Sequence, residues 1–452
     1  MGQQLVHKEN IMLNLSATDK ESVLSQMSDV LFQNGFVKST FKDAVIDREK
    51  EFATGLPTHL CSVAIPHTDV EHINHRTIGV AFVGIFLVID LLVKNLGPAA
   101  QAMVKNLGVS LNVIDVGWPA TSSIAWASSV AAFIIPLGII VNVVLLVTKV
   151  TKTMNVDIWN FWHYTFTAAM VYAVSGSIWQ ALLAAVIFQV ICLKVADWTA
   201  PMMSEFFDLP GVSIATGSTI SYAPGIYLVK LLQRVPGLNK LDADPETIQK
   251  RFGAFGESIF VGLILGLGIG VLAGYKPGDI INLGMSMAAV MVLMPRMVKI
   301  LMEGLMPVSE SARTWLNKRF GEREIYIGLD AAVALGHPAV ISTALILVPI
   351  TVLLAVILPG NQVLPFGDLA TIPFVVAFIV GAARGNIIHS VIVGTIMIAI
   401  SLYIATDVAP IFTDMAKGTN VQMPKGSSEI SSIDQGGNIV NYLIFKLFSL
   451  FN

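Results

Sequence analysis

Apolar positions along this chain gather in long uninterrupted runs. Seven runs of 16 to 37 residues carry no Lys, Arg, Asp or Glu: 122–148, 167–193, 209–229, 258–275, 280–295, 331–367 and 385–406. About 20 apolar residues cross the hydrocarbon layer of a bilayer as a helix. The pattern therefore predicts a mainly α, polytopic helical membrane protein, in which glycine and proline break or re-enter several spans. Residues 77–93, interrupted by Asp90, and the short run 369–383 are weaker candidates.

The N-terminal segment has a different pattern. Residues 19–37 and 39–54 space their apolar side chains at helical intervals, whereas 61–67 and 77–85 are short apolar runs typical of strands. These elements are fewer than a compact α/β domain normally has. We expect a small, incomplete α/β domain ahead of the membrane body.

Composition agrees with this division. The chain is 54% hydrophobic and 13% charged, against about 25% charged residues in a typical soluble domain. Charged residues number 16 among residues 1–75 and 43 among the other 377. A net charge of −3 gives no support for nucleic-acid binding. Two cysteines suggest neither a disulfide framework nor a zinc site, and we expect no metal and no cofactor.

Basic residues orient the predicted spans, because lysine and arginine gather in cytoplasmic loops. The start of the chain has no apolar signal-peptide region, which also predicts a cytoplasmic head. Nine crossings of alternating direction then place all of these basic residues in the cytoplasm. Loops 274–279 and 358–368 and the segment after Asp407 are expected outside. The residues placed in the cytoplasm are Lys149, Lys152, Arg234, Lys240, Lys250, Arg251, Arg296, Lys299, Arg313, Lys318, Arg319, Arg323 and Arg384.

Two interrupted segments resemble each other. Asp157 precedes His163 by six residues and Asp330 precedes His337 by seven, and each pair leads into an apolar run. Paired broken segments in two halves of a transporter point to its binding site. A chance pairing of two acids with two histidines is the alternative.

Ionisable groups within apolar runs are costly and usually face protein or a water-filled cavity. Carboxylates and amides pair with the hydroxyls of a polyol, and an aromatic face packs on its C–H groups. Belt tryptophans at Trp159 and Trp162, helix caps at Asp157 and His337, or a proton relay are the alternatives. The candidate substrate-binding residues are Asp157, Trp159, Asn160, His163, Glu257, Asp330, His337, Asn361 and Asp368.

His67 is the candidate reactive group of the head. A neutral imidazole is a good nucleophile near neutral pH, and its phosphoryl adduct keeps a high transfer potential. Pro66 stiffens the backbone before it, and Arg48 offers donors to phosphoryl oxygens. A histidine after a short strand is otherwise an ordinary loop residue.

The stretch "DREKEFATGL…VAIPHTD" resembles the IIA domains of the fructose/mannitol/galactitol branch of the sugar phosphotransferase system. In those domains the histidine of the matching motif is phosphorylated by the histidine phosphocarrier protein, and an upstream arginine assists. His67 and Arg48 occupy the matching positions. The similarity covers about residues 5–83, so we expect domains at 1–83 and 84–452.

From Gly84 onward the chain is similar to the galactitol-specific IIC permeases of the same system. The stretches that carry this resemblance include "VIDVGWPA", "TKTMNVDIWNFWH", "REIYIGLDAAVALGHPAVISTALILVPI" and "LPGNQVLPFGDLATIPF". The resemblance implies a homodimeric inner (plasma) membrane permease in contact with lipid. It would bind galactitol or a related polyol outside and carry it inward, where a separate IIB component phosphorylates it.

The chain departs from both families. The IIA similarity stops before the part that supplies a second active-site histidine, and the IIC similarity lacks an N-terminal membrane segment. Residues 77–92 resemble both the end of the IIA fragment and the start of the IIC fragment, which is the pattern expected of a junction made by deletion. "GVSIATGSTISYAP" lacks a histidine that relatives carry there, and neither Cys61 nor Cys192 lies in a IIB-like motif. An ion-coupled polyol transporter and a non-functional deletion chimera are therefore the alternatives.

Overall fold

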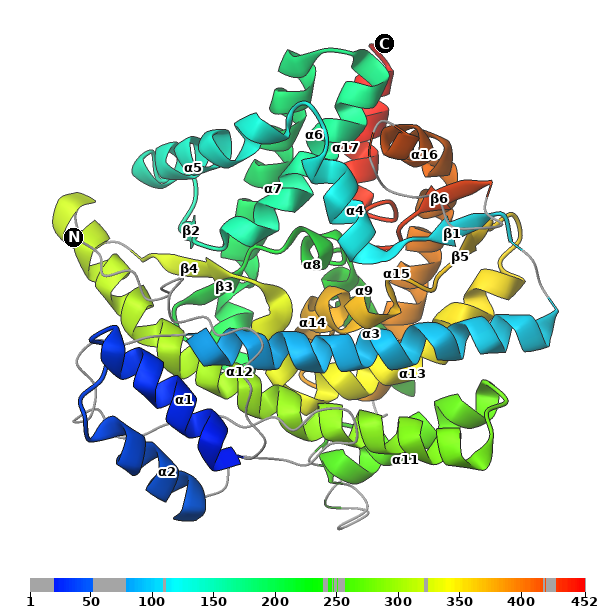
Figure 1. Cartoon of the computed structure of the whole chain (residues 1–452). Coiled ribbons are helices and arrows are strands. Elements are labelled where there is room, and N and C mark those ends of the chain that lie inside the picture. Colours follow the sequence, from blue (N-terminus) through cyan, green and yellow to red (C-terminus); the bar gives the residue numbers. More distant parts are fainter. Residues whose placement is uncertain are drawn as a thin grey trace. The chain divides into compact units, whose positions relative to one another are not determined.

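The computed structural model describes residues 20–51, 79–108, 111–238, 243–245, 247, 250, 257–320, 324–417, 419 and 428–451 (Figure 1). The chain divides into two compact units. One comprises residues 1–90 with 299–305, and the other comprises residues 91–298 with 306–452. Each unit is described by itself.

The described part of the smaller unit is helical. α1 (Lys20–Gln33) packs against α2 (Phe41–Glu51) around Leu24, Val37 and Val45. The two predicted helices are thereby confirmed. The strand predicted at 77–85 is wrong, because α3 (Gly79–Leu107) already begins there; this run lacks the polar–apolar alternation of a half-buried strand. The strand predicted at 61–67 and His67 lie outside the described residues.

The larger unit is mainly helical, which confirms the predicted fold class. Its helices after α3 are α4 (Gly117–Trp126), α5 (Ala131–Val147), α6 (Phe161–Ser175), α7 (Ile178–Phe206), α8 (Gly217–Ser221), α9 (Gly225–Leu232), α11 (Ser258–Leu272), α12 (Pro277–Phe320), α13 (Pro338–Ile357), α14 (Ile372–Ala382), α15 (Ile387–Asp407), α16 (Ala409–Lys417) and α17 (Ile439–Ser449), with the 3₁₀ turns η3 (Ile158–Asn160), η6 (Ala331–Gly336) and η7 (Leu369–Thr371).

Four helical segments among the described residues are long and apolar enough to cross a membrane: α7, residues 277–299 of α12, α13 and α15. Two of the predicted spans are interrupted. The run 122–148 bends by 93° between α4 and α5. The run 167–193 is divided where Gly176, at φ +63°, ends α6, since glycine adopts this left-handed conformation without steric cost. Helix lengths do not confirm nine crossings, and that number stays a prediction.

Glycines allow α11 and α12 to pack at close range. A Cβ on Gly266 would lie 2.7 Å from the carbonyl oxygen of Leu283, and one on Gly270 would lie 3.1 Å from Cα of Ile280. These glycines stand four residues apart on one helix face. The packing follows the small-xxx-small pattern of helix pairs in membranes.

Two small sheets, each of three parallel strands, lie among these helices on either side of α8 (Figure 1). The first has the order β2 (Thr153–Asn155), β4 (Tyr326–Leu329), β3 (Val212–Ile214). The second has the order β5 (Val363–Leu364), β1 (Val113–Asp115), β6 (Glu429–Ser431). Parallel pairing brings the three carboxyl ends of each sheet to one edge.

The second sheet includes parts of two segments that were predicted as loops outside the membrane, 358–368 and the residues after Asp407. The side of the membrane on which they lie stays a prediction, but they are not exposed loops. Instead β5 and β6 pair with β1 inside the larger unit, and residues such as Ser431 and Asn438 are fully buried. Their polar groups are satisfied by neighbouring backbone and side chains, which lets polar sequence lie in a core.

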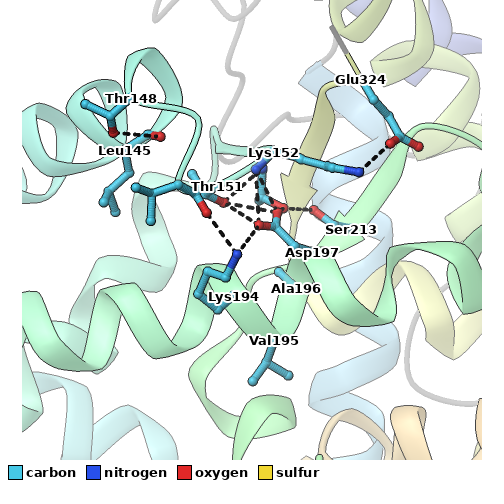
Figure 2. A network of polar contacts seen from close by, with 12 residues as sticks. Leu145, Thr148, Thr151, Lys152, Lys194, Val195, Ala196, Asp197, Ser213 and Glu324 are labelled. Carbon is cyan, nitrogen blue, oxygen red and sulfur yellow. Dashed lines mark hydrogen bonds and ion pairs between the residues drawn. The ribbon is translucent and has the colours of Figure 1, made fainter.

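Asp197 on α7 holds the amino ends of the first sheet, as Figure 2 shows. Its carboxylate accepts hydrogen bonds from the hydroxyl of Thr151 at 3.0 Å and from the backbone N–H of Lys152 at 3.0 Å. It also accepts one from the hydroxyl of Thr153 at 2.8 Å, and Thr153 Oγ1 lies 3.0 Å from Ser213 Oγ on β3. The Asp197 carboxylate therefore fixes the start of β2, and Thr153 connects β2 to β3.

Candidate functional site

The carboxyl edge of the first sheet carries one polar residue beyond each strand. Asp157 follows β2, Asp330 follows β4 and Thr216 follows β3. Each is followed at once by a helical turn: η3, η6 and α8 respectively. The three side chains therefore meet in front of three helix amino ends, where acceptor groups are favoured.

The amide of Asn160 joins the two aspartates. Its Nδ2 donates to Asp157 Oδ2 at 3.0 Å and to Asp330 Oδ2 at 2.8 Å. The hydroxyl of Thr216 donates to the same Asp330 oxygen at 3.3 Å. Asp157 and Asp330 are nevertheless only half-buried. They are placed to offer acceptors to a hydroxyl-bearing solute.

His163 lies one turn further along α6 and is fully buried. Its Nδ1 lies 2.8 Å from the carbonyl oxygen of Asn160, and its Nε2 lies 3.0 Å from Ser218 Oγ. A carbonyl can only accept, so Nδ1 carries the hydrogen. Gly217 leaves room for this ring, since a Cβ there would lie 2.8 Å from His163 Cβ. His163 thus positions Asn160 through a hydrogen bond to its backbone carbonyl.

The second sheet carries its own polar cluster at its carboxyl edge. Asp115 ends β1, and it accepts hydrogen bonds from the backbone N–H of Gly117 and of Asp368, both at 3.0 Å. Asp368, beyond β5, accepts from the hydroxyl of Ser432 at 2.6 Å and from the backbone N–H of Asp434 at 3.2 Å. All three aspartates are buried.

A chain of hydrogen bonds links the two clusters. The amide of Gln435 donates to Asp434 Oδ1 at 3.0 Å and to Ser218 Oγ at 3.3 Å. Ser218 contacts His163, which contacts Asn160. The two sheet edges therefore belong to one continuous polar network.

The other predicted site residues make their contacts elsewhere. Glu257 is exposed at the start of α11. His337 caps α13 through the backbone N–H of Ala339 and packs against the ring of Phe206 at 4.4 Å. Asn361 links α13 to β5, donating to the carbonyl oxygen of Ala355 at 2.8 Å and to that of Val363 at 3.1 Å.

Trp159 is 53% exposed. It lies edge-to-face with Trp118 on α4, at 6.3 Å between ring centroids. Trp118 follows the second sheet and Trp159 the first, so aromatic groups from both halves meet. Such rings suit the C–H face of a sugar or polyol.

The site residues that the sequence did not reveal are an aspartate at the end of β1, two uncharged residues around the start of α8 and five residues of the segment after Asp407: Asp115; Thr216 and Ser218; and Ser432, Asp434, Gln435, Asn438 and Asn441. The run "SSIDQGGN" was the available signal, because so dense a polar stretch at the end of an apolar chain has to be solvated or internally paired. Arg48 lies on α2 in the smaller unit. Among the described residues, no three of His, Cys, Asp or Glu are grouped to hold a metal ion.

Comparison with known proteins gives the family. The family described as "PTS system sugar-specific permease component" matches residues 76–426, and the family described as "Phosphoenolpyruvate-dependent sugar phosphotransferase system, EIIA 2" matches residues 4–85. The two matches overlap at residues 76–85.

The galactitol-specific EIIC components of Escherichia coli K12 and of Escherichia coli O157:H7 are each 44% identical to this chain over 373 residues, which is 82% of this chain and 82% of the relative. The galactitol-specific EIIA component of Escherichia coli K12 is 33% identical over 64 residues, which is 14% of this chain and 43% of that relative. The chain thus spans less than half of the EIIA relative. This chain belongs to the family of multi-pass, sugar-specific permease components of the phosphotransferase system, and its N-terminal segment matches the EIIA family of the same system.

Proposed function

We propose that this permease binds galactitol or a closely related polyol and carries it across the membrane for phosphorylation by a separate IIB component. The names of the EIIC and EIIA relatives both support galactitol. The cytoplasmic head, a homodimeric assembly in lipid, and a division into a IIA-like segment at 1–83 and a permease at 84–452 belong to the same proposal. The described core supports a polyol, because its carboxylates, amides and hydroxyls can pair with hydroxyl groups.

The observation that carries this proposal is the shared amide of Asn160. It has two hydrogens and donates one to each aspartate, Asp157 and Asp330, which come from different strands. Two carboxylates held in this way keep further lone pairs for hydroxyl hydrogens, and each unpaired hydroxyl of a bound polyol would cost about 1–3 kcal/mol. A polyol has several hydroxyls, which can donate to these lone pairs together.

The site binds polyol, in this proposal, between the carboxyl edge of the first sheet and the aromatic pair Trp118 and Trp159. Asp157, Asn160 and Asp330 pair with hydroxyls, and His163 holds Asn160 in place. Asp368 lies in the second cluster and supports the site through the hydrogen-bond chain. Glu257, His337 and Asn361 contribute to the scaffold rather than to the first contacts with the solute.

Transport should yield phosphorylated polyol. Cells that contain this chain, a galactitol IIB component and a complete IIA component should accumulate labelled galactitol as its phosphate, because in this proposal the IIB component phosphorylates the polyol on the cytoplasmic side. The measurement is chromatography of the accumulated label. Asp414→Asn, on an exposed carboxylate paired with Lys417, serves as the control and should behave as wild type. Free galactitol driven by an ion gradient would contradict the proposal and favour a secondary transporter.

Phosphorylation of the head is a separate expectation. We expect His67 to accept phosphoryl groups poorly, since the similarity to EIIA covers less than half of that relative and a phosphohistidine site needs several positioned donors. The purified protein is incubated with carrier protein that bears a labelled phosphoryl group, with a complete IIA protein as positive control. Stoichiometric labelling that disappears in His67→Ala would overturn this expectation.

A further inference from the structure

The cluster on the second sheet contains a buried oxygen that lacks a hydrogen-bond donor. Asp368 has no exposed surface. Its Oδ2 accepts from Ser432 and from the backbone of Asp434. Its Oδ1 is buried and has no partner within the part of the chain that the structure describes. A buried acceptor left in this state costs free energy, so each such oxygen calls for a physical account.

The carboxyl group of Asp115 lies next to Asp368, because its Oδ2 accepts the backbone N–H of Asp368 at 3.0 Å and both side chains are buried. Two carboxylates cannot share a dry site while both are charged, because burial and mutual repulsion both favour the neutral form of one of them. A proton between them removes the repulsion and supplies the missing donor. One added hydrogen thus accounts for both the close approach and the orphan oxygen.

The surroundings supply no other neutralising charge. A third buried carboxyl group, that of Asp434, lies beside the pair, because the backbone N–H of Asp434 donates to Asp368 Oδ2. Tyr222 also faces the cluster, and its hydroxyl lies 3.1 Å from Ser401 Oγ. Among the described residues no lysine or arginine acts on the three aspartates.

We infer that the Asp115–Asp368 pair is a proton-binding site, in which Asp368 Oδ1 carries one proton, donates a hydrogen bond to the carboxylate of Asp115 and thereby joins the strand ends of the second sheet. The hydrogen bonds decide between the two carboxyls. Both oxygens of Asp115 already accept backbone N–H groups, which marks it as the charged partner. Asp368 has a free oxygen, which marks it as the protonated one.

This assignment makes two isosteric substitutions behave differently. In Asp368→Asn the side-chain oxygen can keep the bonds from Ser432 and Asp434, and the new NH₂ takes the place of the protonated oxygen and donates to Asp115. In Asp115→Asn the NH₂ faces a backbone N–H whichever way the amide is turned. The first change preserves the site without a titratable proton, and the second breaks it.

The test is thermal unfolding of the detergent-purified protein between about pH 6 and about pH 9, a range in which an ordinary aspartate stays charged. The proton is present at the lower pH and lost as the pH rises, so wild type should lose stability toward alkaline pH. Asp368→Asn should match wild type at the lower pH, exceed it at the higher pH and show a flatter profile. Asp115→Asn should unfold at lower temperature throughout, and Asp414→Asn should follow wild type.

Infrared spectroscopy gives an independent readout, because a protonated carboxylic acid has its own carbonyl band. Wild type minus Asp368→Asn should show this band, and the band should disappear at alkaline pH. Equal pH profiles for wild type and Asp368→Asn, with no such band, would overturn the inference. So would stability at alkaline pH that depends on sodium rather than choline, since that result assigns the site to a cation. Neither measurement uses galactitol, so the outcome is separate from that of the proposed function.

Discussion

Replacing Asp330 with asparagine should weaken galactitol binding about 10- to 150-fold, which corresponds to the loss of one hydrogen bond to a charged group, about 1.5–3 kcal/mol. Asp330 Oδ2 accepts from Asn160 and Thr216, and its Oδ1 accepts from the backbone N–H of Ala332 at 2.7 Å. Asparagine has one acceptor fewer and turns an NH₂ toward one of these donors. Isothermal titration of purified protein with galactitol measures the effect.

Asp157→Asn is the matched variant. Its oxygen can remain toward Asn160, so the local structure should persist while one acceptor for the polyol is lost. We expect weaker binding with little change in the unfolding temperature, whereas Asp330→Asn should lower both. Size-exclusion chromatography checks folding in each case. If both variants are folded and still bind galactitol with wild-type affinity, the polyol binds elsewhere.

Gly367→Ala should have the largest effect on stability. Gly367 and Gly117 come into direct backbone contact, and a Cβ on Gly117 would already lie 2.8 Å from the carbonyl oxygen of Gly367. A Cβ on Gly367 would overlap the backbone of Gly117. Neither backbone segment can move away without breaking the hydrogen bonds of Asp115 to Gly117 and Asp368. We expect a loss of more than about 4 kcal/mol, in the exceptional range for a single substitution.

Gly268→Ala is the control for this prediction, since nothing lies within 4 Å of a Cβ at that position in α11. Alanine there should be neutral or stabilise the helix by up to about 1 kcal/mol. Fluorescence-detected size exclusion, followed by thermal unfolding, compares the two variants. A monodisperse Gly367→Ala protein that unfolds at the wild-type temperature would show that the two loops can separate without cost.

The sequence predicted Asp157 and Asp330 correctly as residues that interrupt apolar runs, and the structure joins them through Asn160. Their partners Thr216 and Ser218 could not be found in this way. Both are uncharged residues in a run free of charge, and hydropathy does not distinguish a buried hydroxyl network from a loop. His337 resembles His163 only in its spacing from an aspartate. In the structure it is the N-cap of α13, a role that a histidine before proline can also have.

The helical body was predictable from hydrophobicity, and glycine and proline predicted that some spans are broken, but the positions of the breaks were not predictable. The break between α4 and α5 and the break at Gly176 fall inside apolar sequence, so no change in composition marks them. The strands have two to four residues each, too few to show alternation. Their pairing joins distant segments and depends on tertiary contacts that no local pattern records.

The wide separation of the strands has a consequence for biogenesis. β1 pairs with β5 and β6, and Ser428 Oγ bonds to the carbonyl of Asn112 across 316 residues of chain. While the ribosome is still making the intervening segments, Asp115 has no neighbour from β5 or β6, and its strand must wait within a partly assembled helix bundle. Contacts so distant in sequence form late. β6 is therefore the last strand to join the second sheet, and a chain whose synthesis stops before it would leave β1 paired with β5 alone.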